Sequence, residues 1–276
     1  EEEPYLQLLS PAERAGFTNT SGTVVTAYFH IPSKHSHASY RKWIVNFMSL
    51  QEAMVIFTSH DLVSEIKLLR EHASERTLVI PMDLAATRMA TSYDEAFWTR
   101  QSAMDPEREI HPSHELFWIW NEKSEWLQRA VNINPFGTLF FAWIDIGYFR
   151  DETFNDGRIL RAIPSSLGPE QVLMLDVRDL MLEEGKNYVG GGFIGGYAGG
   201  IRKWHRAYYS VLDLNRDQFI GKDQPWMWKT CEIHPGLCML VGPDLSWGHG
   251  NPWFYMAPFL AGKASDSDVF TVYPDT

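Results

Sequence analysis

One aspartate stands out because it follows a run of apolar residues. Asp145 lies in the stretch AWIDIGYFRD, at the end of a predicted strand over 138–145. A buried carboxylate is normally paired, hydrogen-bonded or bound to a metal, because leaving it unpaired costs several kcal/mol. Ligands of open α/β sheets bind at the carboxyl ends of strands, where this aspartate is expected. Two interpretations stay open: a ligand for a divalent cation that also holds a diphosphate, or a residue that caps the turn before Gly147.

Basic side chains nearby could neutralise such a diphosphate. Lys123 lies on the apolar face of the helix pattern at 113–131. A lysine in an apolar stripe often extends its ammonium group to solvent, and the alternative is an ammonium aimed at the phosphates. Arg88, which comes soon after a predicted strand, and Arg100 are further candidates.

A second carboxylate, Asp223, lies among tryptophans. The segment FIGKDQPWMW places Trp226 and Trp228 just after it. Indole rings can hold the apolar face of a sugar ring while a carboxylate takes a proton from a hydroxyl group. The alternative is a solvated acid at a helix N-terminus before Pro225.

A glycine run, YVGGGFIGGYAGG, occupies residues 188–200. Its Gly190, Gly192 and Gly195 match the spacing of the dinucleotide fingerprint, but the run lies late in the chain instead of opening a βαβ unit. The missing side chains allow a ligand to approach the backbone closely, and a structural turn is the alternative.

His249 is a candidate for a metal ligand. It lies between two glycines in SWGHGNPW, and loop residues often carry function. It could bind the same cation as Asp145 through a neutral imidazole, or it could be a loop residue without a role. The sequence contains no Gly-x-Ser-x-Gly motif, no P-loop and no convincing zinc spacing.

Alternating strand and helix patterns must position these groups. The β-α-β-α-β order of the first part predicts a parallel sheet with crossover helices. Pro81 indicates that the third strand ends there or lies at a sheet edge. The last third of the chain is rich in loops and aromatic residues. We therefore expect one α/β domain over 1–276, with a mostly parallel twisted sheet and helices on both faces. The predicted strands are 23–31, 53–59, 76–84, 138–145 and 172–177, and the predicted helices are 36–50, 62–69, 89–108, 113–131 and 202–215.

Composition excludes some classes of protein. The net charge of −11 over 276 residues argues against non-specific nucleic-acid binding, although a local basic patch is compatible with it. Cys231 and Cys238 could form a disulfide, but two cysteines do not imply one, so the redox compartment stays open. No apolar run approaches the roughly 20 residues of a membrane span. The N-terminus has no signal-peptide pattern, so a cytoplasmic location and a luminal one with a removed anchor both fit.

Taken together, these segments resemble the HtrL/YibB-like family, whose members are regarded as glycosyltransferases. The resemblance is carried by TVVTAYFHI, by IWNEK with NPFGTLFFAWIDIGYFRD, and by YVGGGFIGG. The layout is also similar to that of GT-A glycosyltransferases, with a loop-rich C-terminal acceptor region. It implies a nucleotide-sugar-binding half at about 23–150 and an acceptor-binding and catalytic half at about 151–276.

The resemblance also implies roles for individual residues. Asp145 matches the first acid of an Asp-x-Asp metal motif, and Gly147 replaces the second. A cation, Mn²⁺ or Mg²⁺, would rely on Asp145 and His249, and catalysis without a metal stays open. Asp223 matches the region of the catalytic base. The implied donor-binding residues are Thr26, Ala27, Tyr28, Arg88, Lys123, Trp143, Asp145, Gly147, Gly192, Phe193, Gly195 and Gly196, and the implied acceptor-binding residues are Trp226 and Trp228.

The activity that follows from this resemblance is hexosyl or pentosyl transfer. A nucleotide-diphosphate sugar, expected to be a UDP-sugar, would donate to a hydroxyl of an oligosaccharide or glycoprotein glycan with inversion. Lys123 or Arg88, with the cation, would stabilise the departing diphosphate. Two alternatives stay open. One is a non-catalytic carbohydrate-binding protein that retains the fold, and the other is a nucleotide-dependent oxidoreductase that uses the glycine run.

Overall fold

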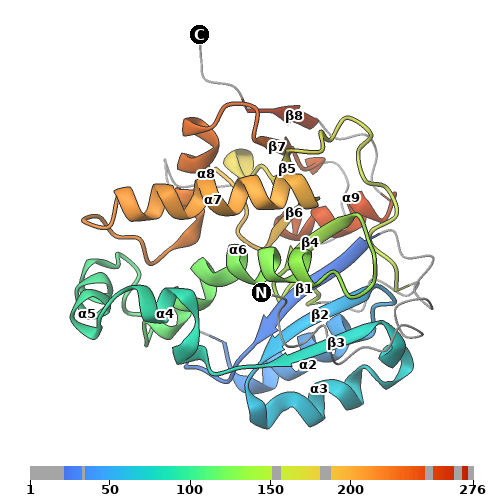
Figure 1. Ribbon diagram of the computed structural model, residues 1–276, viewed down its shortest axis with the longest axis horizontal. Coiled ribbons are helices and arrows are strands. Elements are labelled where there is room, and N and C mark those ends of the chain that lie inside the picture. The colour runs from blue at the N-terminus through green and yellow to red at the C-terminus, as the bar shows by residue number, and fades with distance from the viewer. Residues whose placement is uncertain are drawn as a thin grey trace.

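A single sheet runs through the molecule (Figure 1). The computed structural model describes residues 22–32, 35–150, 157–180, 188–245, 251–263 and 269–272. Within these ranges the sheet has eight strands in the order β3-β2-β1-β4-β6-β5-β7-β8. The strands are β1 (Gly22–Tyr28), β2 (Ala53–Thr58), β3 (Thr77–Pro81), β4 (Phe140–Ile144), β5 (Val172–Leu175), β6 (Phe193–Tyr197), β7 (Cys238–Val241) and β8 (Val269–Thr271).

The sheet is mostly parallel, as the alternating pattern predicts. Strand β1 pairs in parallel with β2 and β4, β2 pairs in parallel with β3, and β5 does so with β7. Strands β6 and β8 run antiparallel to their neighbours. The inference from Pro81 is confirmed, because this residue ends β3 at the edge of the described sheet.

Helices cover both faces of the sheet, and each face has its own apolar core. Adjacent residues of β1 point to opposite faces: Val25 packs with side chains of α6, α7 and α8, and Val24 packs with those of α2, α3 and α9. This explains why the strands read as nearly continuous apolar runs. The helices are α2 (His37–Met48), α3 (Val63–Leu69), α4 (Arg88–Ser92), α5 (Glu95–Met104), α6 (Glu115–Ile133), α7 (Ala198–Leu214), α8 (Asp223–Ile233) and α9 (Met256–Leu260).

The second part of the glycine run does not form the structural turn that was left open as an alternative, because it is the buried strand β6. Gly195 pairs with Ala142 of β4 and with Leu173 of β5. A Cβ atom at Gly195 would lie 2.8 Å from the Phe140 ring, so a glycine is needed for packing there. The run therefore does not form the turn between a strand and a helix that a dinucleotide fingerprint requires.

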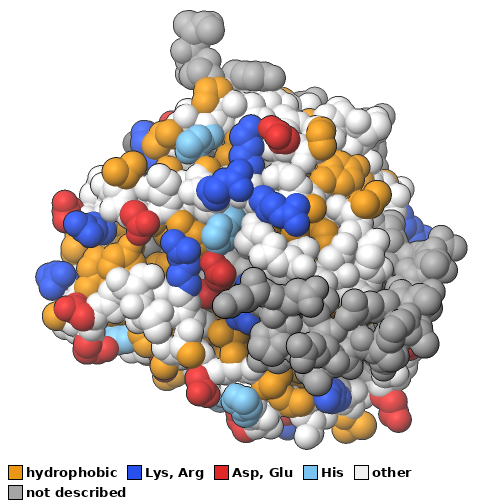
Figure 2. Space-filling model, in the orientation of Figure 1, with side chains coloured by type: hydrophobic (Ala, Val, Ile, Leu, Met, Phe, Trp, Pro, Cys, Tyr) orange, Lys and Arg blue, Asp and Glu red, His pale blue; other side chains and the backbone are white. Residues whose placement is uncertain are grey.

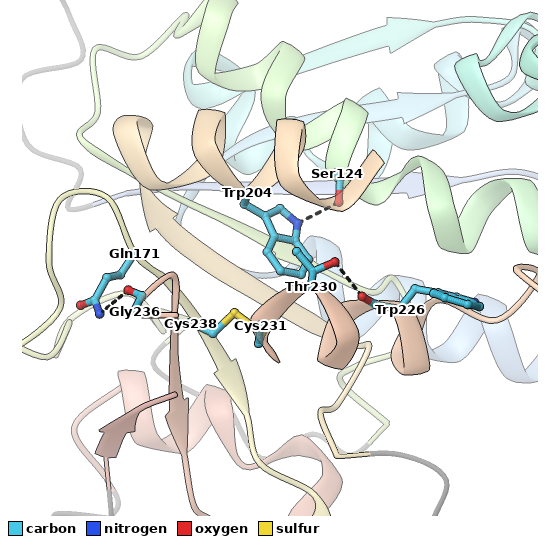
Figure 3. Close-up of a disulfide and its surroundings, with 8 residues drawn as sticks. All are labelled: Ser124, Gln171, Trp204, Trp226, Thr230, Cys231, Gly236 and Cys238. Carbon is cyan, nitrogen blue, oxygen red and sulfur yellow. Dashed lines mark hydrogen bonds between the residues drawn. A yellow bond between two sulfur atoms is a disulfide. The ribbon is translucent and has the colours of Figure 1, made fainter. Parts of the chain in front are cut away.

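The two cysteines are bonded to each other, which the sequence left open. Cys231 of α8 and Cys238 of β7 form a disulfide with a Cα–Cα distance of 5.5 Å (Figure 3). Both residues are fully buried. The bond fixes the end of α8 to the sheet, and the start of α8 carries Asp223.

The surface of this acidic chain is not uniformly acidic. Lys and Arg side chains gather over α7 on the face shown in Figure 2, and Arg202, Lys203 and Arg206 of that helix are exposed. None of the helices in the described ranges is long and apolar enough to cross a membrane.

Candidate functional site

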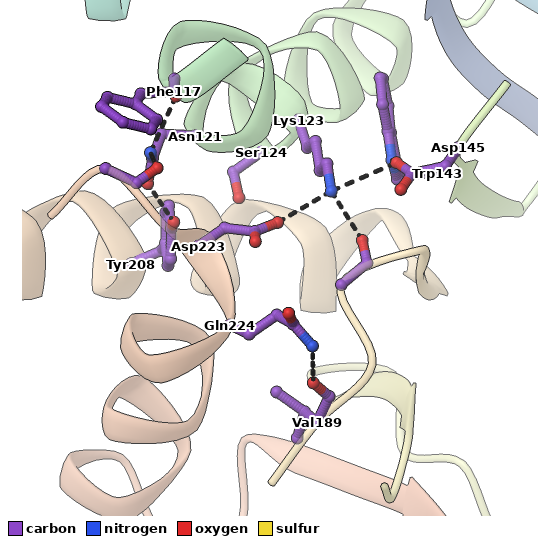
Figure 4. A network of polar contacts seen from close by, with 12 residues as sticks. Phe117, Asn121, Lys123, Ser124, Trp143, Asp145, Val189, Tyr208, Asp223 and Gln224 are labelled. Atoms are coloured by element: carbon purple, nitrogen blue, oxygen red, sulfur yellow. Dashed lines mark hydrogen bonds and ion pairs between the residues drawn. The ribbon is translucent and has the colours of Figure 1, made fainter. Parts of the chain in front are cut away.

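The ammonium group of Lys123 is the centre of a buried polar network (Figure 4). We call this group of Lys123, Asp145, Gly191 and Asp223 the lysine network. Its Nζ donates to Asp223 Oδ2 at 2.8 Å and to the carbonyl oxygen of Gly191 at 2.8 Å. The same atom lies 3.2 Å from Asp145 Oδ1. A lysine ammonium has three hydrogens to donate, so these three oxygens use its full capacity.

Four elements bring this network together at the carboxyl end of β4. Helix α6 supplies Lys123, and Asp145 directly follows β4. Because β6 is antiparallel to β4, the residues before β6 lie beside Asp145, whose backbone N–H donates to Gly192 O at 3.0 Å. Helix α8 begins at Asp223, where the positive end of the helix dipole favours a carboxylate.

Surrounding hydrogen bonds hold both carboxylates in place. The indole N–H of Trp143 donates to Asp145 Oδ1 at 2.8 Å. On the other side, Asn121 donates through Nδ2 to the carbonyl oxygens of Ile220 and Gly221, which fixes the segment that leads into Asp223. The network is therefore preorganised from two sides.

The charges of the network do not balance, since two carboxylates share one ammonium. Burial raises the pKa of Asp223, and the neighbouring Lys123 only partly opposes this shift. Burial lowers the pKa of Lys123, but Asp145 and Asp223 outweigh it and the net shift is upward. The lysine therefore stays charged, and Asp223 is a stronger base than an exposed aspartate.

A cavity of about 230 Å³ opens over this network. Asp145 is its more accessible carboxylate, with 39% of the side chain exposed against 5% for Asp223. A second cavity of about 50 Å³ shares the lining residues Ala27, Tyr40 and Ile146 with the first. Many of the walls are aromatic and come from both halves of the chain. The aromatic lining residues of the main cavity are His35, Tyr40, Trp43, Trp120, Trp143, Tyr148, Trp253 and Phe254.

Seven of the sixteen predicted site residues meet at this cavity. The predicted residues that line the main cavity are Ala27, Lys123, Trp143, Asp145, Gly147, Gly192 and Asp223. Tyr28 lines the smaller cavity.

Five of the predicted donor-binding residues line neither cavity, and Arg88 and Thr26 are two of them. Arg88 lies with its guanidinium carbon 4.0 Å from the centre of the Tyr209 ring, and its Nη1 is 3.9 Å from Glu125 Oε2. It starts α4, which packs on α6, and no residue of that helix lines either cavity. Thr26 is fully buried inside β1. A role of Arg88 in donor binding therefore stays a prediction, without support from its position.

The predicted residues of the glycine run beyond Gly192 lie in strand β6 and do not line the cavity. Phe193 belongs to the apolar core on the α2 side of the sheet. Gly195 and Gly196 lie within β6, and a Cβ atom at Gly196 would be 2.9 Å from the carbonyl oxygen of Gln171. Only the start of the run, at Gly191 and Gly192, reaches the cavity.

The two predicted acceptor-binding tryptophans lie outside the cavity lining. Trp226 is buried, and its indole N–H donates to the carbonyl oxygen of Phe219. Trp228 is partly exposed and stacks on Tyr188 with ring centroids 4.8 Å apart. Of the two, Trp228 is the more exposed.

Several cavity residues were missed by the sequence reasoning, and Arg150 is the most informative. Its guanidinium carbon lies 4.4 Å from the centre of the Trp43 ring and 5.1 Å from that of Phe254. Trp43 lies on α2 and lines the same cavity. The available signal was an arginine in an aromatic segment five residues after Asp145, in the same stretch AWIDIGYFRD.

The described residues alone do not fit a divalent cation. They contain no group of three His, Cys, Asp or Glu side chains that could hold one. The Oδ1 atom of Asp145 already accepts from Trp143 and lies next to the Lys123 ammonium. His249, the second predicted ligand, lies outside the residues that the structure describes. A cation bound by Asp145 and His249 therefore stays a prediction.

The chain is similar to a curated bacterial protein and to solved structures of glycosyltransferases. Protein HtrL of Escherichia coli (strain K12) is 22% identical over 225 residues, which are 71% of this chain and 78% of that protein. A glycosyltransferase involved in glycosylation of the major capsid of PBCV-1 is a structural neighbour with a TM-score of 0.42 and 13% identity, covering 80% of this chain and 81% of its own. The apo form of mouse xyloside xylosyltransferase 1 has a TM-score of 0.44 and 12% identity, covering 90% and 95%. The family described as "Bacterial protein of unknown function (HtrL_YibB)" matches residues 20–254, so the predicted resemblance is confirmed and the chain belongs to this family.

Proposed function

We propose that this chain is a glycosyltransferase that moves a sugar from a nucleotide-diphosphate sugar, such as a UDP-sugar, to a hydroxyl of a glycan. The observation that carries the proposal is the pair of carboxylates, Asp145 and Asp223, held on either side of Lys123 under an aromatic cavity. The network lies at the carboxyl ends of parallel strands, where open α/β sheets bind ligands.

Asp223 is the general base in this proposal. Burial raises its pKa, and its carboxylate lines the cavity, so it can accept a proton from an acceptor hydroxyl. The hydroxyl oxygen then forms a bond to the anomeric carbon, and the bond from that carbon to the phosphate oxygen breaks. The proton ends on Asp223 and the electron pair leaves with the nucleoside diphosphate, which gives inversion.

Lys123 has a positioning role in this scheme. Because its three hydrogens already contact Asp223, Asp145 and Gly191, it holds both carboxylates in fixed orientations. It also opposes the upward shift in the pKa of Asp223, since a nearby positive charge favours the carboxylate form. This role differs from the diphosphate contact that the resemblance implies for Lys123.

The donor base fits the end of β1 in this proposal. Ala27 lines both cavities, and the small one also borders Tyr28 and Tyr40. Aromatic rings there offer stacking surfaces for a planar base. The glycan acceptor would approach from the side of α8, where Trp228 and Tyr188 present a stacked aromatic pair.

The test is turnover with a panel of nucleotide sugars. Release of nucleoside diphosphate is measured with glycan acceptors for the wild type and for Asp223→Asn. We expect the variant to bind donor and to lose about a hundredfold or more in rate, the usual size of a general-base contribution. The matched control is Asp217→Asn, an exposed acid outside the cavity, which should keep the wild-type rate.

The outcomes of this assay test the base assignment, the transferase activity and the need for a metal separately. A full rate for Asp223→Asn would remove the base assignment. Donor binding without turnover in the wild type would favour the non-catalytic carbohydrate-binding protein. Parallel assays with EDTA test the divalent cation separately, since a rate that survives chelation requires no bound metal.

A further inference from the structure

A diphosphate bound in the cavity needs a positively charged side chain whose N–H groups are not already paired with oxygens of the protein. Every donor hydrogen of Lys123 contacts an oxygen of the protein. Turning one of them toward a phosphate would leave a buried carboxylate or carbonyl without its partner, which costs about 1–3 kcal/mol or more. The lysine network, with one ammonium and two carboxylates, is moreover net negative and repels phosphate.

The other lysine of the cavity lining is also engaged. Lys222 precedes α8, and its Nζ lies 2.7 Å from Glu107 Oε2. The carboxylate of Glu107 therefore neutralises the charge of Lys222. Lys222 is thus no better placed than Lys123 to hold a diphosphate.

Arg150 differs from both lysines. In the part of the chain that the structure describes, it forms no ion pair with an acidic side chain. Its contacts are the faces of Trp43 and Phe254 and a 3.3 Å hydrogen bond from Nε to the carbonyl oxygen of Gly147. That bond uses Nε, so the two terminal nitrogens of the guanidinium remain available to a ligand within the described structure. The side chain lines the cavity.

Its environment also preorganises the group for an anion. Two aromatic faces hold the guanidinium plane, and arginine remains charged at any physiological pH. A guanidinium offers parallel N–H groups that match two oxygens of a phosphate. Arg150 follows Asp145 by five residues, so both project into one cavity from the turn after β4.

We propose that Arg150 binds the diphosphate of the donor and stabilises it as it leaves. This inference rests on the proposed function and assigns the electrostatic part of it to a residue outside the lysine network. The negative charge that develops on the departing phosphate oxygen would be met by the fixed guanidinium.

The experiment measures binding of inorganic pyrophosphate by calorimetry in the presence of EDTA, which removes divalent cations. Wild type, Arg150→Gln, Arg150→Lys and the control Arg41→Gln are compared. Arg41 is an exposed arginine of α2, 3.5 Å from Glu65, and lies outside the cavity lining. We expect a dissociation constant about tenfold or more higher for Arg150→Gln, since hydrogen bonds to charged groups are worth about 1.5–3 kcal/mol. Arg150→Lys should be intermediate, and Arg41→Gln should match the wild type.

Thermal melting of each variant separates loss of binding from loss of folding. If Arg150→Gln does not fold, Arg150→Lys decides, because it keeps the charge and loses the paired N–H groups. Unchanged pyrophosphate affinity in a folded Arg150 variant overturns the inference, and so does a wild type that binds no pyrophosphate under these conditions.

The same variants keep this inference separate from the proposed function. Sugar transfer by Arg150→Gln at the wild-type rate would leave the transferase proposal standing and remove the role of Arg150. Arginine-dependent pyrophosphate binding without any sugar transfer would leave the diphosphate site standing and remove the transferase proposal.

Discussion

Replacing Lys123 by methionine tests the lysine network directly. The substitution keeps an unbranched side chain of similar length and removes the ammonium group. Asp223, with 5% of its side chain exposed, would lose its cation, and Asp145 would lose the same partner. Removing one partner of a buried ion pair costs about 3–5 kcal/mol, because the remaining charge is left uncompensated. We expect a loss of this size in the free energy of unfolding at about pH 8.

The loss in unfolding free energy should depend on pH, and the direction of this dependence follows from the pKa of Asp223. Burial already raises the pKa of this carboxyl in the folded protein, and without Lys123 nothing in the ion pair opposes the shift. A folded state with a raised pKa binds more protons than the unfolded state, so its stability increases as pH falls. Between about pH 8 and pH 5, Lys123→Met should therefore recover part of its lost stability, whereas the wild type should gain less.

Urea unfolding followed by tryptophan fluorescence measures both effects. The double variant Lys123→Met, Asp223→Asn removes the uncompensated charge and should be more stable at high pH than Lys123→Met alone. Lys67→Met is the matched control, because Lys67 is exposed on α3 and its loss should change little. A loss below about 1 kcal/mol, with the pH dependence of the wild type, would refute the reasoning, since that is the size of an exposed pair.

Three further predictions concern the surroundings of the network. Burial raises the pKa of Glu122 to about 7, so this group should make the wild type lose up to about 3 kcal/mol of unfolding free energy as pH rises from about 4.5 to 7. Unfolding of Glu122→Gln across the same range should lack this slope, and an unchanged slope would assign it to another group. Replacing both Cys231 and Cys238 by serine should lower the unfolding free energy by about 2–3 kcal/mol, the value for closing so short a loop, and a reducing agent should lower the melting temperature of the wild type alone. Gly191→Ala should reduce sugar transfer with little loss of stability, because its Cβ atom would lie 3.0 Å from Asp223 Oδ2; a wild-type rate would mean that the carboxylate can move without consequence.

The fold was largely predictable from the first half of the sequence. Continuous apolar runs such as AMVIFT, separated by helical spacing, specify parallel strands that are buried on both faces. Pro81 correctly indicated the edge, because a proline cannot donate to a second neighbour in the ladder. Strand β6 was missed because its glycines have low strand propensity, and only packing against Phe140 and Gln171 requires them.

The candidate site was predictable as a set of residue types but not as a network. Asp145 was recognisable because a carboxylate follows an apolar strand, and Asp223 because two tryptophans closely follow it. Their common partner was not recognisable, since Lys123 and Asp223 are separated by 100 residues and meet only through the packing of α6 and α8 against the sheet. In the same way, Arg88 and Arg150 are equivalent as basic residues after strands, and the tertiary structure alone places one over the Tyr209 ring and the other in the cavity.

The sequence by itself determined the parallel α/β core and the identity of the two carboxylates, because apolar periodicity and a charge beside it are local properties of the chain. The tertiary structure decided which cation neutralises them, which arginine stays available and which glycines approach the cavity. These choices depend on distances between segments far apart in the sequence, and on the antiparallel direction of β6 beside β4, which brings Gly191 and Asp145 to the same lysine.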